Sequence, residues 1–225
     1  MSFITSPGVI VPPLTAGGVA YGTGSQAKVN SAGTAGQFLQ SAGAGVPVWA
    51  SSAGAMTFLS TVTISNSATA DVETTFNSTY DTYVIVGKIN TTTAANPLLN
   101  CRLKIGGSYA TANYNYHTAI SSSTANTYAG SAANLAPAIV ITSALGADAS
   151  YSVDFVMYVQ NPTSTTEQKA VFWTGRYKPT TSDQNMTYGQ GANTASTAEL
   201  TGVRFYTSSN NLVSGYVRLY GIAKS

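Results

Sequence analysis

The chain has 225 residues, of which 8% are charged, whereas roughly 25% is usual in soluble domains. Ten Lys and Arg oppose eight Asp and Glu, so the net charge is +2, and the basic residues are scattered singly. This distribution lacks the basic stripe that neutralises nucleic-acid phosphates, which argues against a nucleic-acid partner. A surface of hydroxyl, amide and backbone groups suits a protein that works outside the cell on neutral ligands better than a cytosolic enzyme.

Residues 1–14 are predicted to be a docking peptide. Three prolines disfavour a helix there and favour an extended path. The segment also carries a cluster of apolar side chains, namely Phe3, Ile4, Val9, Ile10 and Val11. A short apolar segment ahead of a glycine-rich stretch has little to bury against in its own chain, so we expect it to bind another protein. The alternative is a strand that folds back on the C-terminal domain.

The beginning of the chain also bears on where the protein is made. It has neither the basic region nor the small-residue cleavage site of a signal peptide. No apolar run approaches the roughly 20 residues of a membrane-spanning helix. We therefore expect synthesis in a cytoplasm without a signal peptide, and no membrane span.

Residues 15–55, called the neck below, are rich in Gly, Ala and Ser and show no useful helical or strand periodicity. Glycine inside a helix costs about 1 kcal/mol relative to alanine, and glycines recur throughout this segment. The apolar residues come singly, so the neck cannot form a core alone. We expect association of several copies to bury Phe38, Leu39 and Trp49. The alternative is a disordered linker.

The neck resembles the neck segments of bacteriophage tail-fibre and head-fibre proteins. The resemblance lies in GVAYG at residues 18–22, GTAGQFL at 33–39 and SAGAGVPVW at 41–49. In that family such a segment joins a particle-anchoring N-terminus to a distal β-domain, in chains that usually form trimers. The resemblance therefore implies a virion protein, a homotrimer held by residues 1–14 to another virion protein of the tail or the capsid. A tail position implies adhesion to a host receptor, and a capsid position implies decoration with at most weak adhesion.

Residues 56–225 predict an all-β domain. Apolar and polar residues alternate with period two in several short segments, and no helical pattern is convincing. The segments are 58–64, 82–89, 99–105, 114–120, 138–142, 151–159, 170–178, 200–207 and 213–223. We expect 151–159 to pair with 170–178, and 200–207 to form a hairpin with 213–223. The expected fold is a jelly-roll-like antiparallel β-sandwich behind an extended neck. An immunoglobulin-like sandwich is disfavoured by the domain's length and by its lack of a Cys, Trp, Cys pattern.

Catalytic chemistry is weakly represented. His117 is the one histidine, and the acids fall mostly in or beside polar turns, so neither a triad nor a carboxylate pair is indicated. The chain lacks the spacing of a His/Cys metal site, and Cys101 lies in an apolar alternation as a small core residue. We predict a non-enzymatic protein without a metal or cofactor.

Recognition through aromatic and polar groups is the function that remains. Fourteen tyrosines are many for a chain so poor in charge, and Tyr offers both a flat apolar face for a sugar ring and a hydroxyl. The loop-rich span 107–117, with two further tyrosines, is the candidate site for host cell-surface glycans. Its residues are Tyr109, Asn113, Tyr114, Tyr116, His117, Tyr128 and Tyr188. The alternative is that these tyrosines are half-buried strand residues or line subunit contacts.

Overall fold

In the computed structural model the chain divides into two compact units, Met1–Gly54 and Ala55–Ser225. The structure describes residues 16–22, 27–51, 56–73, 76–91, 97–122, 128–145, 152–179 and 184–223. The predicted docking residues Phe3, Ile4, Val9, Ile10 and Val11 lie outside these ranges. Within them the chain forms strands, turns and bends but no helix, and so no helix able to cross a membrane.

The N-terminal unit contains two short antiparallel hairpins, which the absence of periodicity in the neck did not predict. Strand β1 (Ala20–Gly22) pairs with β2 (Ala27–Val29), and β3 (Gln37–Gln40) pairs with β4 (Val48–Ser51). Strands of three or four residues are too short for side-chain alternation to reveal them.

Trp49 connects the second hairpin to the segment before it. The indole Nε1 donates a hydrogen bond to the Ser31 carbonyl at 2.7 Å. The ring lies against Gly33, where a Cβ atom would come within 2.6 Å of it. Glycine at this position therefore lets the ring approach the backbone.

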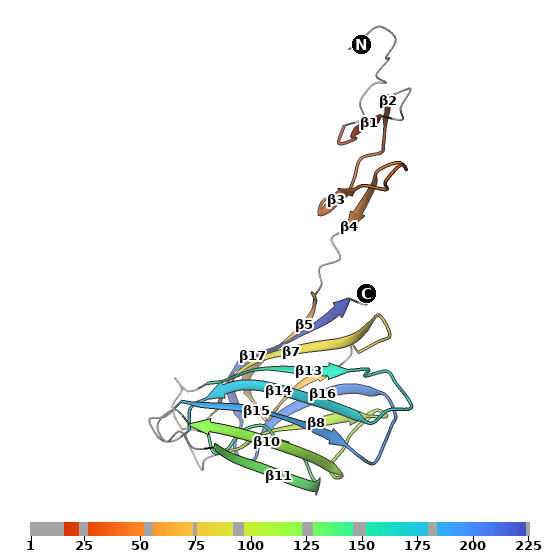
Figure 1. Ribbon diagram of the computed structural model, residues 1–225. Helices are drawn as coiled ribbons and strands as arrows, with labels where there is room; N and C mark the ends of the chain where they lie inside the picture. The colour runs from red at the N-terminus through yellow and green to blue at the C-terminus, as the bar shows by residue number, and fades with distance from the viewer. Residues whose placement is uncertain are drawn as a thin grey trace. The chain divides into compact units, whose positions relative to one another are not determined.

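The C-terminal unit is an antiparallel β-sandwich (Figure 1), so the predicted all-β, jelly-roll-like class is confirmed. One sheet has eight described strands in the order β11-β10-β15-β14-β13-β7-β17-β5. The other has the order β12-β8-β16-β6, with β9 beside β8. The strands are β5 (Met56–Ser67), β6 (Thr69–Glu73), β7 (Tyr80–Thr91), β8 (Leu99–Ile105), β9 (Ser108–Tyr109), β10 (Tyr114–Ser122), β11 (Tyr128–Ala136), β12 (Ile139–Val140), β13 (Ser152–Gln160), β14 (Lys169–Tyr177), β15 (Asn185–Asn193), β16 (Leu200–Thr207) and β17 (Leu212–Ala223).

The core lies between the inner faces of the two sheets. Alternation along each strand sends one set of side chains inward, as in β13, where residues 153, 155, 157 and 159 are buried. Cys101 is one of these core residues, as predicted, and burial raises the pKa of its thiol. The largest fully buried side chains include Tyr83, Tyr114, Tyr177, Phe205 and Met157.

Two glycines of the eight-stranded sheet make room for one core residue. Phe155 on β13 lies between Gly87 on β7 and Gly175 on β14, which are its register partners. A Cβ atom at Gly87 would come within 2.3 Å of the Phe155 ring, and one at Gly175 within 2.8 Å of the Phe155 Cβ atom. The missing side chains therefore leave room for the Phe155 ring at Gly87 and for the Phe155 Cβ atom at Gly175.

Two expectations about pairing have different outcomes. The predicted pair of β13 and β14 is present, with Met157 opposite Trp173. The predicted hairpin of 200–207 with 213–223 is wrong, because β16 pairs with β6 and β8 while β17 pairs with β5 and β7. Residues 208–211 instead carry the chain from one sheet to the other.

Candidate functional site

The outer face of the eight-stranded sheet carries rows of side chains that run across the strands. His117 of β10 lies opposite Gln190 of β15. Gln190 lies opposite Phe172 of β14, which in turn lies opposite Tyr158 of β13. Because Trp173, the next residue on β14, is buried, alternation turns this row away from the core.

Phe172 places an exposed aromatic ring on this face. Its ring stacks on the Tyr158 ring, with centroids 4.6 Å apart and planes 7° apart. Since Tyr158 lies on the β13 side, the opposite face of the Phe172 ring is turned toward β15. Phe172 remains 43% exposed. Because Tyr158 packs against one face of the Phe172 ring, the other face offers a flat apolar surface beside Gln190.

A groove of about 880 Å³ opens next to this ring. Ala170 of β14 and Ala192 of β15, which are opposite each other in register, place short side chains in its lining. The β10–β11 edge and the loop 161–168 also contribute to the lining. Short side chains beside longer ones leave the space that forms the groove.

Amide side chains dominate the polar lining of the groove. They are Asn115, Asn134, Gln160, Asn161, Gln168 and Gln190. Some are engaged: Gln168 Nε2 donates to the Thr194 carbonyl at 3.2 Å. In the part of the chain that the structure describes, the side-chain amides of Gln160 and Gln190 make no hydrogen bond. An amide carries two donors and an acceptor, so these two groups can bind hydroxyls in either direction.

The described lining contains one carboxylate, that of Glu167, and no Lys or Arg. Glu167 Oε2 accepts a hydrogen bond from Asn161 Nδ2 at 3.1 Å. The groove is therefore suited to stacking and neutral hydrogen bonding more than to ion pairing.

Lys169 anchors the loop 161–168 that borders the groove. Its side chain is only 1% exposed. The ammonium donates to the Glu167 carbonyl at 2.8 Å and also to the Ser164 carbonyl. Burial lowers the pKa of Lys169, while the carboxylates of Glu167 and Glu199 act in the opposite direction. These two backbone contacts hold the loop in place beside the groove.

The structure brings only part of the predicted site to this groove. Tyr116 and His117 line it, and His117 is exposed. Tyr188 lies on the same outer face of β15, 36% exposed, two residues from Gln190 and outside the lining. Tyr128 begins β11, and its side chain is outside the described part of the chain.

Tyr114 is a correction to the predicted site, because it is fully buried and cannot contact a ligand. Its hydroxyl accepts a hydrogen bond from the Leu103 amide at 2.7 Å and lies 3.2 Å from the Ala110 carbonyl, to which it donates. Burial raises the pKa of Tyr114, opposed by the Leu103 hydrogen bond. The ring therefore ties β10 to the opposite sheet.

Tyr109 and Asn113 also lie away from the groove. Tyr109 belongs to β9 in the other sheet. Asn113 has a φ of 64°, and its carbonyl accepts a hydrogen bond from the Thr194 amide at 2.9 Å, so it shapes a turn.

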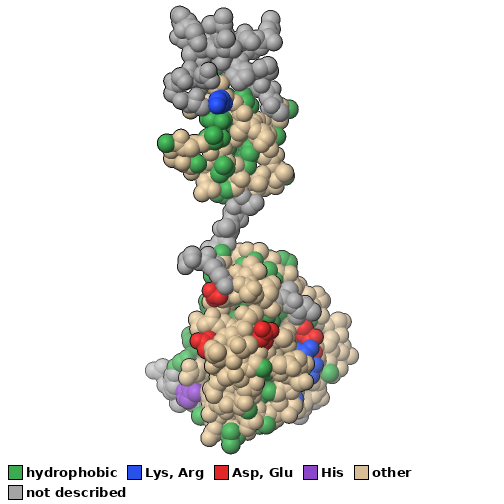
Figure 2. Space-filling model, turned by 90° about the vertical axis from the view of Figure 1, so that its right-hand side faces the viewer, with side chains coloured by type: hydrophobic (Ala, Val, Ile, Leu, Met, Phe, Trp, Pro, Cys, Tyr) green, Lys and Arg blue, Asp and Glu red, His purple; other side chains and the backbone are tan. Residues whose placement is uncertain are grey.

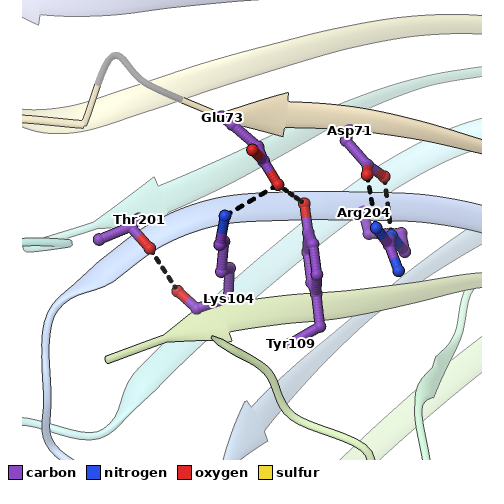
Figure 3. A network of polar contacts seen from close by, with 6 residues as sticks. All are labelled: Asp71, Glu73, Lys104, Tyr109, Thr201 and Arg204. Carbon is purple, nitrogen blue, oxygen red and sulfur yellow. Dashed lines mark hydrogen bonds and ion pairs between the residues drawn. The ribbon is translucent and has the colours of Figure 1, made fainter. Parts of the chain in front are cut away.

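Tyr109 belongs instead to an ionic network on the outer face of the five-stranded sheet (Figure 3). Its hydroxyl donates to Glu73 Oε1 at 2.8 Å, and Lys104 Nζ binds the same oxygen at 3.1 Å. Arg204 makes two hydrogen bonds to Asp71, at 2.8 and 2.6 Å, and its guanidinium carbon lies 3.9 Å from the Tyr109 ring centroid. These ion pairs and hydrogen bonds join side chains of β6, β8, β9 and β16, so the network links the strands of this sheet.

The neck residues differ in exposure. Phe38 is 47% and Leu39 38% exposed, whereas Trp49 is partly buried through its contact with Gly33 and Ser31. Val46 and Val48 are also large apolar side chains in contact with solvent.

Sequence reasoning missed Phe172, Gln160 and Gln190 as site residues. One signal was present: the alternation in 170–178 places Phe172 on the polar face of its strand, opposite to Trp173. A large aromatic residue on a wet face is an informative exception. The amides gave no signal, because they come together only through the strand order.

No protein-family model matches this chain, and no curated protein matches it. Among solved structures, the chain has a weak similarity to the CBM2 module of the evolved Dit of Lactobacillus casei BL23 phage J-1. The two are 9% identical with a TM-score of 0.20, over 73% of this chain and 76% of that one. A similarity this low supports no inference about fold or function.

Proposed function

We propose that this protein is a non-enzymatic bacteriophage virion fibre protein whose β-sandwich binds neutral host-surface saccharides in the groove beside Phe172. The observation that carries the proposal is the supported aromatic face of Phe172 next to the unengaged amides of Gln160 and Gln190. A sugar ring packs its C–H face on an aromatic ring, and its hydroxyls bond to amides. The groove volume of about 880 Å³ lies within the range of small-molecule sites.

The low charge of the protein supports a neutral ligand. Figure 2 shows one side of the molecule, on which few of the side chains are acidic or basic. In the groove, the carboxylate of Glu167 accepts a hydrogen bond from the Asn161 side chain. Binding in the groove should therefore depend on stacking and neutral hydrogen bonds, which salt screens little.

The neck supports the fibre part of the proposal. Its sequence resembles phage fibre necks, and in a single chain Phe38, Leu39 and Val48 are 47%, 38% and 49% exposed. A homotrimer would remove these side chains from water. Residues 1–14 would then hold the fibre to another virion protein, in the tail for host adhesion or in the capsid for decoration. The decoration role needs the neck but not the groove.

A glycan array probed with the labelled full-length protein tests the proposal. We expect binding to one class of neutral host saccharide that persists at high salt. Phe172→Ala should weaken that binding about ten-fold, the equivalent of roughly 1.4 kcal/mol. Phe58→Ala is the matched control, because Phe58 is 55% exposed but lies on β5, outside the groove lining. Equal losses in the two variants, or no binding to any host saccharide, would contradict the proposal and favour decoration.

A further inference from the structure

A second, shallower hollow of about 500 Å³ lies on the same outer face as the groove. It is lined by residues that include Lys88 of β7, Asp154 of β13, Arg176 of β14 and Tyr216 of β17. These four residues form one cross-strand row, since Asp154 lies opposite both Lys88 and Arg176, and Lys88 lies opposite Tyr216.

Positive charge is in excess at this row. Arg176 forms an ion pair with Asp154, and Ser152 Oγ donates to the same Asp154 oxygen at 3.1 Å. Lys88 lies next to Asp154 in register but forms no ion pair with it or with any other described residue. The exposed Lys88 ammonium is thus available to a ligand.

Arg218 adds a further cation. It lies two residues from Tyr216 on β17, and its guanidinium carbon is 4.1 Å from the centroid of the Tyr216 ring. Arg176, Lys88 and Arg218 against Asp154 leave three positive charges and one negative, a local net charge of +2. The flanking partners in register, Met186 on β15 and Thr63 on β5, are uncharged.

The two hollows are far enough apart to bind different parts of one extended ligand. Phe172 and Arg176 are four residues apart on β14 and point to the same side, which places them about 13 Å apart along the strand. This exceeds the Debye length of about 10 Å at 0.1 M salt, so the cations hardly affect the groove through space.

We propose that the hollow lined by Lys88 and Arg176, with Arg218 beside its Tyr216 ring, is an anion subsite that takes a phosphate or carboxylate group of a cell-surface saccharide. The inference rests on the proposed function, since the neutral part of the same saccharide occupies the groove beside Phe172. The planar guanidinium fork can bind two oxygens of a carboxylate or phosphate at once, and the Lys ammonium supplies a point charge. A saccharide that carries such a group would place it toward β17 and its neutral rings at Phe172, whereas a neutral saccharide would occupy the groove alone.

Immobilised dextran and carboxymethyl-dextran, which share a backbone and differ in charge, test the subsite without relying on the groove. We expect the full-length protein to prefer carboxymethyl-dextran at low salt. It should lose this preference at about 0.5 M salt, because salt at that concentration screens exposed charges. Lys88→Gln and Arg218→Gln should each weaken binding about two- to five-fold. Lys28→Gln is the matched control, because it removes an exposed lysine from strand β2 of the neck.

The outcomes separate this inference from the proposed function. An equal loss in Lys28→Gln, or no preference for the carboxymethyl polymer, would overturn the anion subsite. Phe172→Ala should leave the preference for carboxymethyl-dextran over dextran unchanged and weaken the binding of neutral saccharides. Failure of that second effect would contradict the groove and not the subsite.

Discussion

Phe172 and Tyr158 lie directly opposite each other on β14 and β13, with their rings nearly parallel. The stack fixes the orientation of Phe172 before any ligand arrives. Binding to a ring that is already ordered avoids part of the entropy cost of ordering it. We therefore expect this pair to contribute strongly to the affinity of the proposed saccharide site.

Tyr158→Ala should weaken saccharide binding without unfolding the domain. Loss of the stack costs about 0.5–1.5 kcal/mol, and Phe172 then samples other rotamers. We expect a smaller loss of affinity than in Phe172→Ala, measured by titration calorimetry with the saccharide found on the array. A larger loss in Tyr158→Ala than in Phe172→Ala would show that Tyr158 contacts the ligand itself.

Gly87→Ala should destabilise the β-sandwich. The added methyl group would lie 2.3 Å from the Phe155 ring, so the ring or the strand must shift. Overpacking of this kind costs about 1–3 kcal/mol, which denaturant unfolding measures. Gly22→Ala is the control, because a Cβ atom there has nothing within 4 Å. Equal stability of the two variants would contradict the packing described for Phe155.

The Glu73 network should make stability depend on acid pH. Hydrogen bonds from Tyr109 and Lys104 hold the pKa of Glu73 below its ordinary value of 4.5. The folded protein thus binds this proton less tightly than the unfolded chain, so Glu73 stabilises the fold above about pH 4.5 and the contribution is lost as the pH falls through the lowered pKa.

Glu73→Gln tests this dependence by urea unfolding between about pH 3 and 8. We expect it to lower the free energy of unfolding at neutral pH by less than about 1 kcal/mol, because the ion pair is partly exposed, and to flatten the acid limb. Glu199→Gln, an exposed acid outside the network, is the control. An unchanged acid limb in Glu73→Gln would contradict the role of the network.

Lys169→Met should loosen the loop beside the groove. The substitution keeps the apolar stem and removes the hydrogen bonds to the Glu167 and Ser164 carbonyls, at a cost of about 1–3 kcal/mol. Hydrogen exchange should accelerate in residues 161–168, and saccharide binding should weaken. Unchanged exchange in that loop would show that it is held by its other contacts.

Light scattering of the purified protein tests the role of the neck. If a trimer buries Phe38 and Leu39, the full chain should have three times the mass of one chain, and Phe38→Ser with Leu39→Ser should shift it toward the monomer. A monomer whose residues 15–52 still resist protease would contradict association as the source of order in the neck.

Strands that alternate clearly were predictable, because one buried face imposes period two. The segments 82–89 and 151–159 correspond to β7 and β13 for this reason. Strand β15 was not predicted, since Gly189 and Gly191 weaken its pattern. Those glycines make room for the side chains of Trp173 and Ile139, which lie on other strands, so the pattern of β15 alone does not explain them.

Long-range pairing explains the other differences. Asn210 has a positive φ of 68°, as expected of a turn residue, but the turn leads from one sheet to the other. The tyrosine-rich span 107–117 likewise divides between Tyr109 on one sheet, Tyr114 in the core and His117 on the other sheet. Its neighbours in the groove come from residues 160–172 and 190–194, which the sequence alone does not bring together.

Amide chemical-shift mapping on the full-length protein shows whether the saccharide binds in the groove beside Phe172. We expect the largest shifts at the groove, on Phe172, Gln190 and Gln160, and we expect them to persist at high salt. Shifts confined to the five-stranded sheet around Tyr109 and Arg204, or spread over the neck, would contradict this expectation.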